Sequence, residues 1–430
     1  MRNLVPILAT LSLGALMLFL IFRAEPQPPN AKETETPVET TKPEPPARIT
    51  PLSLLAENPD WTELEPYQQS ISRTEFEHLL TEIFTTDETW RKYISIHENH
   101  AEIAKSSDPT NPPFILEFAS GQHTTTPPRN WKTTASRSAT PQGKPLTGLH
   151  IAIDPGHIGG EWAKVEGRWF QIGNGKPVTE GDMTLKVAKI LQPRLEKLGA
   201  KITLVRSKPE PITSFRPSDF GEIAKKTVEN DPESLRKFTE KLFYRTAEIR
   251  ARANLVNHKI QPDLVLCLHF NAEAWGDPEN PTLVPRTHFH ILLNGAYTTD
   301  EVRLADQRFA MLKKLLQRTH EEEALVGKTI AHTFAEISNL PPYTYFSGGN
   351  NFRTIPSSPF LYARNLLANR LYDCPVIFME PYVMNSTIDY ARIQAGDYQG
   401  LREINGKNIP SIFQEYADAL TQGLIRHYEN

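Results

Sequence analysis

The stretch IAIDPGHIGG, residues 151–160, decides the fold. Its first four residues alternate as in a buried strand, and the following Pro-Gly pair ends the strand in a tight turn. His157 is therefore expected at the carboxyl end of a strand. Because ligands of open α/β sheets bind in the crevice outside these strand ends, His157 is a candidate metal ligand or acid–base group.

A second stretch, PDLVLCLHFNA at residues 262–272, has the same form, since an apolar strand run ends at His269. Two carboxylates stand in similar places. Glu180 precedes a predicted helix, and Glu380 ends the apolar run CPVIFMEP of residues 374–381. Two imidazoles and one carboxylate can hold zinc with a position left open for water, and a nearby glutamate can take the proton of that water. The four residues therefore predict a metal-dependent hydrolase.

Strands and helices alternate around these residues. A helix is expected after Asp182, with its apolar positions on one face as far as Leu198, and the strand KITLV of residues 201–205 follows it. This order implies a parallel strand pair with a right-handed crossover. Further strands are expected at 288–293 and 374–381, and a last helix towards the C-terminus. The sequence thus predicts an α/β domain.

The chain before this domain divides by composition. An apolar segment without charges predicts a membrane helix within residues 1–24, and an uncleaved signal anchor is favoured over a cleaved signal peptide. Residues 25–51 are rich in Pro, Glu and Thr, which predicts a disordered tether. Residues 52–118 are expected to form a small, mostly helical accessory module, and residues 119–146 a linker.

Composition excludes some functions. The 430 residues are 39% hydrophobic, which allows a substantial core, and a net charge of -4 without a basic stripe argues against nucleic-acid binding. The two cysteines, Cys267 and Cys374, are expected as buried free thiols, with a single disulfide left open. For His97 and His100 in the accessory module, an exposed polar turn is favoured over a functional site.

Four motifs occur in order within residues 148–428: IAIDPGHIGG, VTEGDMTLKVAKIL, RANLVNHKIQPDLVLCLHFNA and PVIFMEPYVMNS. With them the chain resembles the zinc-dependent N-acetylmuramoyl-L-alanine amidases of the type 3 family, bacterial enzymes that remove peptide stems from cell-wall glycan. The resemblance implies an α/β sheet of about six mostly parallel strands with helices on both faces. It also implies that His157, Glu180 and His269 are zinc ligands and that Glu380 is the catalytic carboxylate.

The resemblance further implies the reaction and its place. The catalytic domain is expected at residues 147–430, with insertions at about 207–250 and 276–360, and to cleave the amide bond between N-acetylmuramic acid and L-alanine in peptidoglycan. The domain is expected in the periplasm, held at the inner membrane by the N-terminal helix, or exported if the signal is cleaved. An activator protein is a further candidate partner.

The chain also departs from the family pattern. Ile158 stands where the family usually has glycine, and the loop from Glu161 to Val178 is long, so a remodelled approach to the metal is expected. In some relatives a helix inserted at the position of residues 276–360 places a glutamate on the open zinc position. The corresponding glutamates here are Glu321, Glu322, Glu323 and Glu336. A solvated helix face is the favoured interpretation of this cluster.

Alternative ligands and functions stay open at this point. His288 and His290 are alternative ligands, although alternation on a half-exposed strand is favoured, and Glu180 could be only a helix-start charge. The same fold could carry a zinc peptidase or amidohydrolase that acts on another substrate. A non-catalytic wall-binding protein is disfavoured, because it would need none of Glu180, His269 and Glu380.

Overall fold

The computed structural model describes residues 52–429 except 107, 109, 121–124, 139 and 346–348. The predicted membrane helix and tether, at residues 1–24 and 25–51, lie outside the described residues. In the described part of the chain, no helix is both long and apolar enough to cross a bilayer.

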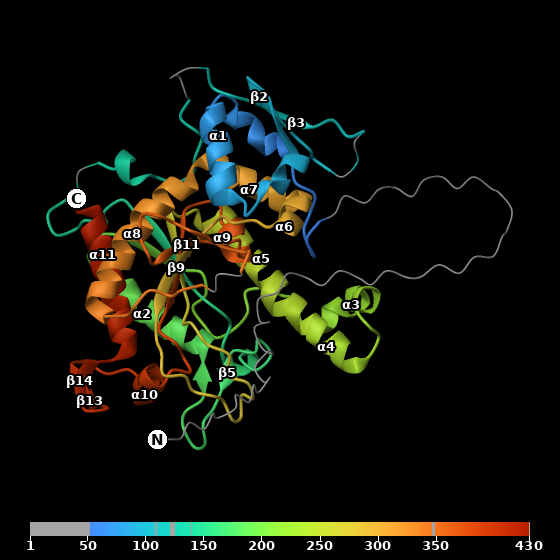
Figure 1. Ribbon diagram of the computed structural model, residues 1–430. Helices are drawn as coiled ribbons and strands as arrows, with labels where there is room; N and C mark the ends of the chain where they lie inside the picture. The colour runs from blue at the N-terminus through green and yellow to red at the C-terminus, as the bar shows by residue number, and fades with distance from the viewer. Residues whose placement is uncertain are drawn as a thin grey trace, which may run out of the picture. The chain divides into compact units, whose positions relative to one another are not determined.

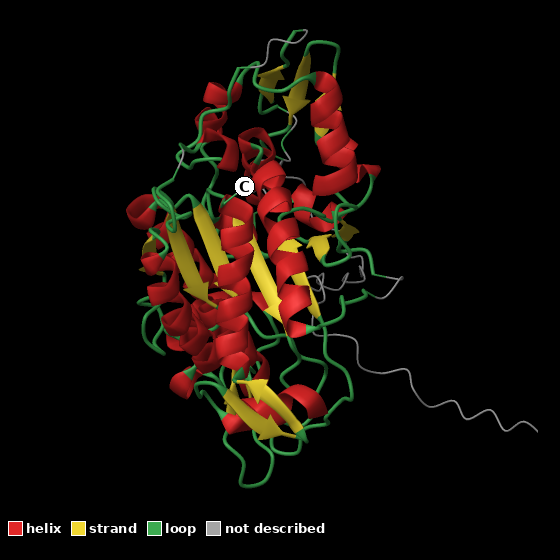
Figure 2. Ribbon diagram, turned by 90° about the vertical axis from the view of Figure 1, so that its left-hand side faces the viewer, coloured by secondary structure: helices red, strands yellow, loops and turns green. Residues whose placement is uncertain are grey.

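A seven-stranded sheet forms the centre of the fold (Figures 1 and 2). Its strands are β4 (His150–Pro155), β7 (Lys201–Leu204), β8 (Leu264–Leu268), β9 (Phe289–Leu293), β10 (Arg353–Thr354), β11 (Leu361–Ala363) and β12 (Val376–Pro381). Their order is β10-β11-β9-β12-β8-β4-β7. Four of the six strand pairings are parallel, and the pairs β12–β9 and β10–β11 are antiparallel. The predicted α/β class with a mostly parallel sheet is confirmed.

Three long helices cover one face of this sheet. They are α2 (Glu180–Lys197), α8 (Thr319–Ser338) and α11 (Ile412–Tyr428). Their apolar residues join one core with Ile151, Leu266 and Ile377 of the central strands, because alternate strand residues point to this face. Both views show α8 and α11 side by side (Figures 1 and 2). They approach so closely that a Cβ atom on Gly423 would lie 2.9 Å from Ile330 Cα.

The opposite face is covered by α5 (Glu248–Leu255) and α9 (Leu367–Leu371). Here the core contains Val265, Cys267 and Phe378 of the strands together with Cys374. Both cysteines are buried and free, as expected for apolar packing residues. Helices on both faces therefore protect the parallel strands from water.

Residues 207–250 are mostly helical from Pro217 onward, after the helix-free stretch 207–216. They contain α3 (Gly221–Thr227), α4 (Pro232–Lys241) and a π-helical turn, η7 (Leu242–Ala247), that continues directly into α5. Figure 1 shows α3 and α4 projecting away from the sheet. This segment is therefore an excursion that returns to the sheet through α5.

Residues 52–118 contain helical turns and a small sheet. The helix α1 (Arg73–Leu79) begins after Ser72, whose hydroxyl accepts a hydrogen bond from the backbone N–H of Glu75 at 3.2 Å. Three short antiparallel strands follow: β1 (Ile94–Ile96), β2 (His100–Ile103) and β3 (Phe114–Glu117). Phe76 and Trp90 of this region share a core with residues of α7 (Ala305–Gln317), so the region packs on the α/β domain.

The remaining described elements are short. The strands are β5 (Trp169–Phe170), β6 (Val178–Thr179), β13 (Leu401–Ile404) and β14 (Lys407–Pro410). The helices are α6 (Thr299–Arg303) and α10 (Thr387–Ala395). The short helical turns are η1 (Trp61–Tyr67), η2 (Leu80–Phe84), η3 (Glu88–Lys92), η4 (Thr134–Ser136), η5 (Gly160–Trp162), η6 (Pro217–Phe220) and η8 (Val256–Ile260).

The close approach of α8 and α11 gives a test of the fold. We expect Gly423→Val to lower the free energy of unfolding by about 1–3 kcal/mol, because the added atoms overlap the backbone at Ile330. Gln422→Val, on the exposed side of the same turn, is the matched control and should change stability by less than about 0.5 kcal/mol. Urea unfolding of both variants measures the difference, and equal losses would contradict this packing.

Candidate metal centre

A buried arginine stabilises the turn that carries His157. Arg252 of α5 donates hydrogen bonds to the carbonyls of Pro155 and His157, both at 2.8 Å. Its guanidinium also pairs with Asp154 at 2.9 Å and with Glu248 at 2.7 Å. His157 itself has a left-handed backbone, with φ of 59°. The buried ion pairs therefore stabilise the turn after β4, in which the backbone at His157 leaves the direction of the strand.

Gly156 is required in this turn because β4 and β8 are neighbours. A Cβ atom at position 156 would lie 2.2 Å from Cε1 and 2.4 Å from Nε2 of the His269 ring. The two imidazole rings lie at right angles, with centroids 5.1 Å apart and an interplanar angle of 83°. Only a residue without a side chain lets the two strand ends bring their histidines this close.

Glu180, the first residue of α2, lies between the two histidines. Its Oε2 atom lies 3.2 Å from His157 Nε2, and its Oε1 atom lies 3.0 Å from His269 Nδ1. The backbone N–H of Phe270 also donates to Oε1, at 3.2 Å. One ligand atom from each of His157, Glu180 and His269 lies within 4.8 Å of the other two. The structure thus brings together the three predicted ligands, and two nitrogens and one carboxylate oxygen suit a zinc-like cation.

The charges in this group stabilise one another. Burial disfavours the charged form of His157, but the carboxylates of Glu180 and Glu166 outweigh burial and raise the pKa of His157 to about 9. Burial likewise opposes ionisation of Glu180, yet the two histidines hold the pKa of Glu180 well below its usual range. The pKa of His269 is lowered by burial. A negative carboxylate between two imidazoles is a site that favours a cation.

Glu380 lies at the carboxyl end of β12, next to β8 in the sheet. Burial and then the negative charge of Glu180 raise the pKa of Glu380 to about 8. The ring of Phe378, two residues earlier on the same side of β12, stacks on His269 with centroids 4.3 Å apart. The fourth predicted residue is therefore on the same sheet edge as the other three and is electrostatically coupled to them.

Two residues of the long loop 161–178 join the site, although no sequence pattern singled them out. Both carboxylate oxygens of Glu166 accept from the backbone N–H of Ile158, at 2.9 and 3.0 Å, and Oε1 lies 3.5 Å from His157 Nδ1. Arg168 places Nε 3.3 Å from both His157 Nε2 and Glu180 Oε2. Glu166 therefore orients the ring of His157 from the side opposite Glu180.

The family departure at Ile158 also has a structural reason. Ile158 is fully buried and packs in a cluster with Phe220, Leu242 and Phe243. All three belong to the segment 207–250, so the segment provides the apolar pocket that a larger residue in the histidine turn needs. The buried position of Ile158 therefore depends on two parts of the chain, the histidine turn and the segment 207–250.

His288 and His290 lie outside the group around Glu180. His290 is the direct cross-strand partner of Glu380 on β9, and its Nε2 atom lies 3.4 Å from the hydroxyl of Tyr345. His288 Nε2 lies 3.3 Å from Glu273. Burial holds the pKa of His290 well below its usual range, so this ring is neutral at physiological pH. Among the described residues, neither histidine completes a three-residue metal group.

The four glutamates of α8 have partners elsewhere. Glu323 is fully buried, lies 3.8 Å from Lys314 Nζ, and accepts from the backbone N–H of Val376 at the amino end of β12. Glu322 accepts from the backbone N–H of Thr134 at 2.9 Å. The remaining two are exposed and pair with arginines: Glu321 with Arg318 and Glu336 with Arg426. The favoured interpretation as a solvated face holds for the exposed pair but not for the buried one.

The glycine in the histidine turn gives a sharp test of the site. We expect Gly156→Ala to lower divalent-metal affinity at least tenfold, because the methyl group and the His269 ring cannot occupy the same space. Gly221→Ala, where the new Cβ atom meets open space, is the matched control. Zinc bound after dialysis is measured for both variants, and an unchanged zinc content in Gly156→Ala would refute the geometry.

Comparison with known proteins identifies a family for this chain. The family model described as N-acetylmuramoyl-L-alanine amidase matches residues 151–403. No curated protein sequence matches this chain.

Among solved structures, the chain is similar to the N-acetylmuramyl-L-alanine amidase of Mycobacterium smegmatis. The two are 15% identical with a TM-score of 0.38, over 66% of this chain and 98% of that one. The chain is 14% identical to the N-acetylmuramoyl-L-alanine amidase of Nostoc punctiforme, with a TM-score of 0.33, over 66% of this chain and 99% of that one. The CwlD amidase of Clostridioides difficile was solved in complex with the GerS lipoprotein. It is 11% identical to this chain, with a TM-score of 0.36, over 65% of this chain and 98% of that one.

The family match includes three of the motifs with His157, Glu180 and His269 and the strand that ends at Glu380. The matched residues make up more than half of the chain, which therefore belongs to the N-acetylmuramoyl-L-alanine amidase family and shares the enzyme activity of that family.

Proposed function

We propose that the chain is a zinc-dependent hydrolase that cleaves the amide bond between N-acetylmuramic acid and L-alanine in peptidoglycan. Family membership supports the reaction and its cell-wall substrate. The observation that carries the metal dependence is the convergence of His157, Glu180 and His269, with one ligand atom of each within 4.8 Å of the others. Three protein ligands leave a coordination position open, which is the arrangement of catalytic zinc sites.

The donor atoms fit such an ion. His157 Nε2 and His269 Nδ1 both face the same carboxylate, and Glu166 lies 3.5 Å from the other ring nitrogen of His157. A second carboxylate behind a ligand histidine is the usual support for a metal site. When bound, zinc would polarise the substrate carbonyl and lower the pKa of a water molecule.

We assign the proton transfers to Glu380. Its carboxylate takes a proton from the water that attacks the carbonyl carbon of the lactyl group, and a new C–O bond forms. The same carboxyl group then gives the proton to the nitrogen of L-alanine as the C–N bond breaks. A pKa of Glu380 raised to about 8, by burial and by Glu180, supports transfer in both directions near neutral pH.

We also propose where the enzyme works. Membership of a cell-wall amidase family indicates the cell envelope. The apolar segment within residues 1–24 would anchor the chain in the inner membrane, with the tether 25–51 holding the catalytic domain in the periplasm. Cleavage of the segment would instead release the enzyme. An activator protein is a proposed partner, and one structurally similar amidase was solved in complex with a lipoprotein.

The metal dependence is tested first. The purified enzyme should release peptide stems with a free L-alanine amino terminus from peptidoglycan, lose this activity in a chelator, and regain it with added Zn²⁺. Glu180→Ala should lose the bound zinc of this site, because a ligand is removed. Release of other fragments would favour a peptidase of the same fold, and undiminished zinc in Glu180→Ala would remove Glu180 from the ligand set.

The role of Glu380 is tested separately. We expect Glu380→Gln to keep zinc and to lose hydrolysis by about two to four orders of magnitude, because an amide cannot accept the proton of the attacking water. Glu403→Gln, an exposed position on β13, is the control and should keep full activity. Turnover of labelled peptidoglycan and zinc content are measured together, and near-normal turnover of Glu380→Gln contradicts the assignment.

A further inference from the structure

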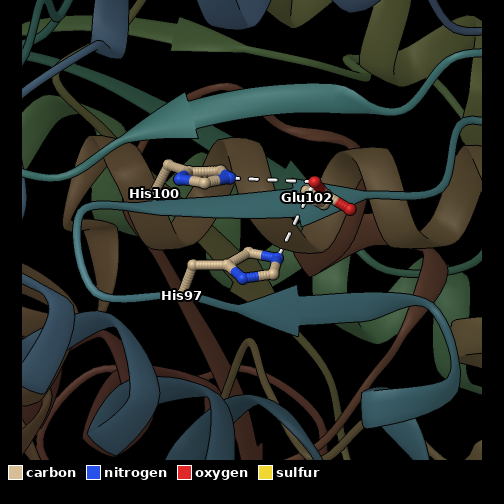
Figure 3. A group of neighbouring side chains, drawn as sticks. All are labelled: His97, His100 and Glu102. Carbon is tan, nitrogen blue, oxygen red and sulfur yellow. Dashed lines mark ion pairs between the residues drawn. The ribbon is translucent and has the colours of Figure 1, made fainter.

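We propose a second metal site on the outer face of the hairpin formed by β1 and β2, built from His97, His100 and Glu102, for a borderline divalent cation such as Zn²⁺. Figure 3 shows both imidazoles pointing toward the carboxylate of Glu102. One ligand atom of each residue lies within 4.8 Å of the other two. The site lies in residues 52–118 and takes no part in the proposed hydrolysis.

The hairpin places the three side chains on one face. The backbone N–H of His97 donates to the carbonyl of His100 at 2.9 Å, so the two residues between them form a tight turn and the histidines are paired. Glu102 follows His100 by two positions on β2. Since side chains of a strand alternate between faces, all three groups point to the outer face of the sheet.

The distances match a small metal ion. The Nε2 atoms of His97 and His100 both lie 3.7 Å from Glu102 Oε1. In a tetrahedral zinc site with bonds of about 2.0–2.1 Å, neighbouring ligand atoms are about 3.4 Å apart. A shift of a few tenths of an ångström in side chains that are partly exposed would close the site.

The ring of His100 is already oriented for this role. Its Nδ1 atom lies 2.8 Å from the side-chain oxygen of Asn99, and a hydrogen bond between them puts the proton on Nδ1. The lone pair is then on Nε2, the atom that faces Glu102. A hydrogen bond to the outer nitrogen of a ligand histidine is how proteins fix the ring and its tautomer.

The strands under the site pack into a hydrophobic core. Ile94, Ala101 and Ile103, which alternate with the three ligands along the two strands, are at most 1% exposed and belong to a hydrophobic core. On the outer face, Glu117 of β3 is the direct cross-strand partner of His100. Glu117 is therefore a candidate for a fourth ligand, in competition with water and with Gln69, whose side chain donates to it at 3.1 Å.

A surface ion pair of protonated histidines with Glu102 accounts less well for this arrangement than a shared metal ion does. The rings of His97 and His100 stack with centroids 4.5 Å apart and an interplanar angle of 17°. Two imidazolium ions in that position would repel each other, whereas two neutral imidazoles that share a cation would not. The two histidines do flank a turn, as expected from the sequence. The sequence did not show that Glu102 of β2 lies beside them.

The stoichiometry of zinc binding tests the proposal. The purified full chain, stripped of metal by a chelator, is titrated with Zn²⁺ alone in a calorimeter. We expect two equivalents in the wild type and one in the double variant His97→Ala/His100→Ala, which keeps full activity on peptidoglycan. The matched control His78→Ala/His258→Ala removes two exposed histidines elsewhere and should still bind two. Circular dichroism confirms that each variant is folded.

Three further variants separate this site from the proposed catalytic one. Glu102→Gln and Asn99→Ala should each lower the zinc affinity of the hairpin site about tenfold or more. The zinc affinity of the catalytic site should stay unchanged. His269→Ala should keep the hairpin equivalent and lose the other, so failure of one site does not imply failure of the other. The proposal is overturned if the wild type binds zinc only at the catalytic site. It is also overturned if the variant His97→Ala/His100→Ala still binds two equivalents of zinc.

Discussion

The buried carboxylate of Glu180 is the interaction on which the rest of the site depends. An ionised carboxylate that is 3% exposed costs several kcal/mol unless it is compensated. Its compensation comes from three parts of the chain: His157 after β4, His269 with the amide of Phe270 after β8, and Arg168 in the loop 161–178. The same charge therefore positions all of these segments, and it makes a bound cation favourable where they meet.

Two buried arginines stabilise the backbone around Glu180 and His157. Arg206 donates to the carbonyl of Gly181 at 2.8 Å, and Arg252 donates to the carbonyls of Pro155 and His157. Burial and the charge of Arg252 lower the pKa of Arg206 to about 10, so both guanidiniums remain charged at neutral pH. Because each arginine contacts backbone rather than a ligand side chain, the turns are fixed before any ligand binds.

The sequence predicted the four central residues because they follow a general rule: parallel strands bring their carboxyl ends to one edge of a sheet. His157, His269 and Glu380 each end an apolar run, and Glu180 begins a helix. Glu166 and Arg168 were missed, because a loop without periodicity does not show which side chain turns inward. The antiparallel pairing of β9 with β12 was missed as well, since a buried strand has the same apolar pattern in either direction.

The structure also decides what the helix α8 can do. A glutamate that blocks a metal site must be able to leave it, but Val326, Ile330 and Phe334 of α8 are fully buried in the main core. Exposing three such side chains costs about 5–9 kcal/mol, which is comparable to the stability of a whole domain. Glu323 is buried with them, against Lys314 and at the amino end of β12, whereas Glu380 lies at the carboxyl end of that strand. In this chain α8 is therefore a permanent layer of the fold. Its buried Glu323 binds the amino end of β12 and its buried Glu322 binds the backbone of Thr134, so neither covers the metal group.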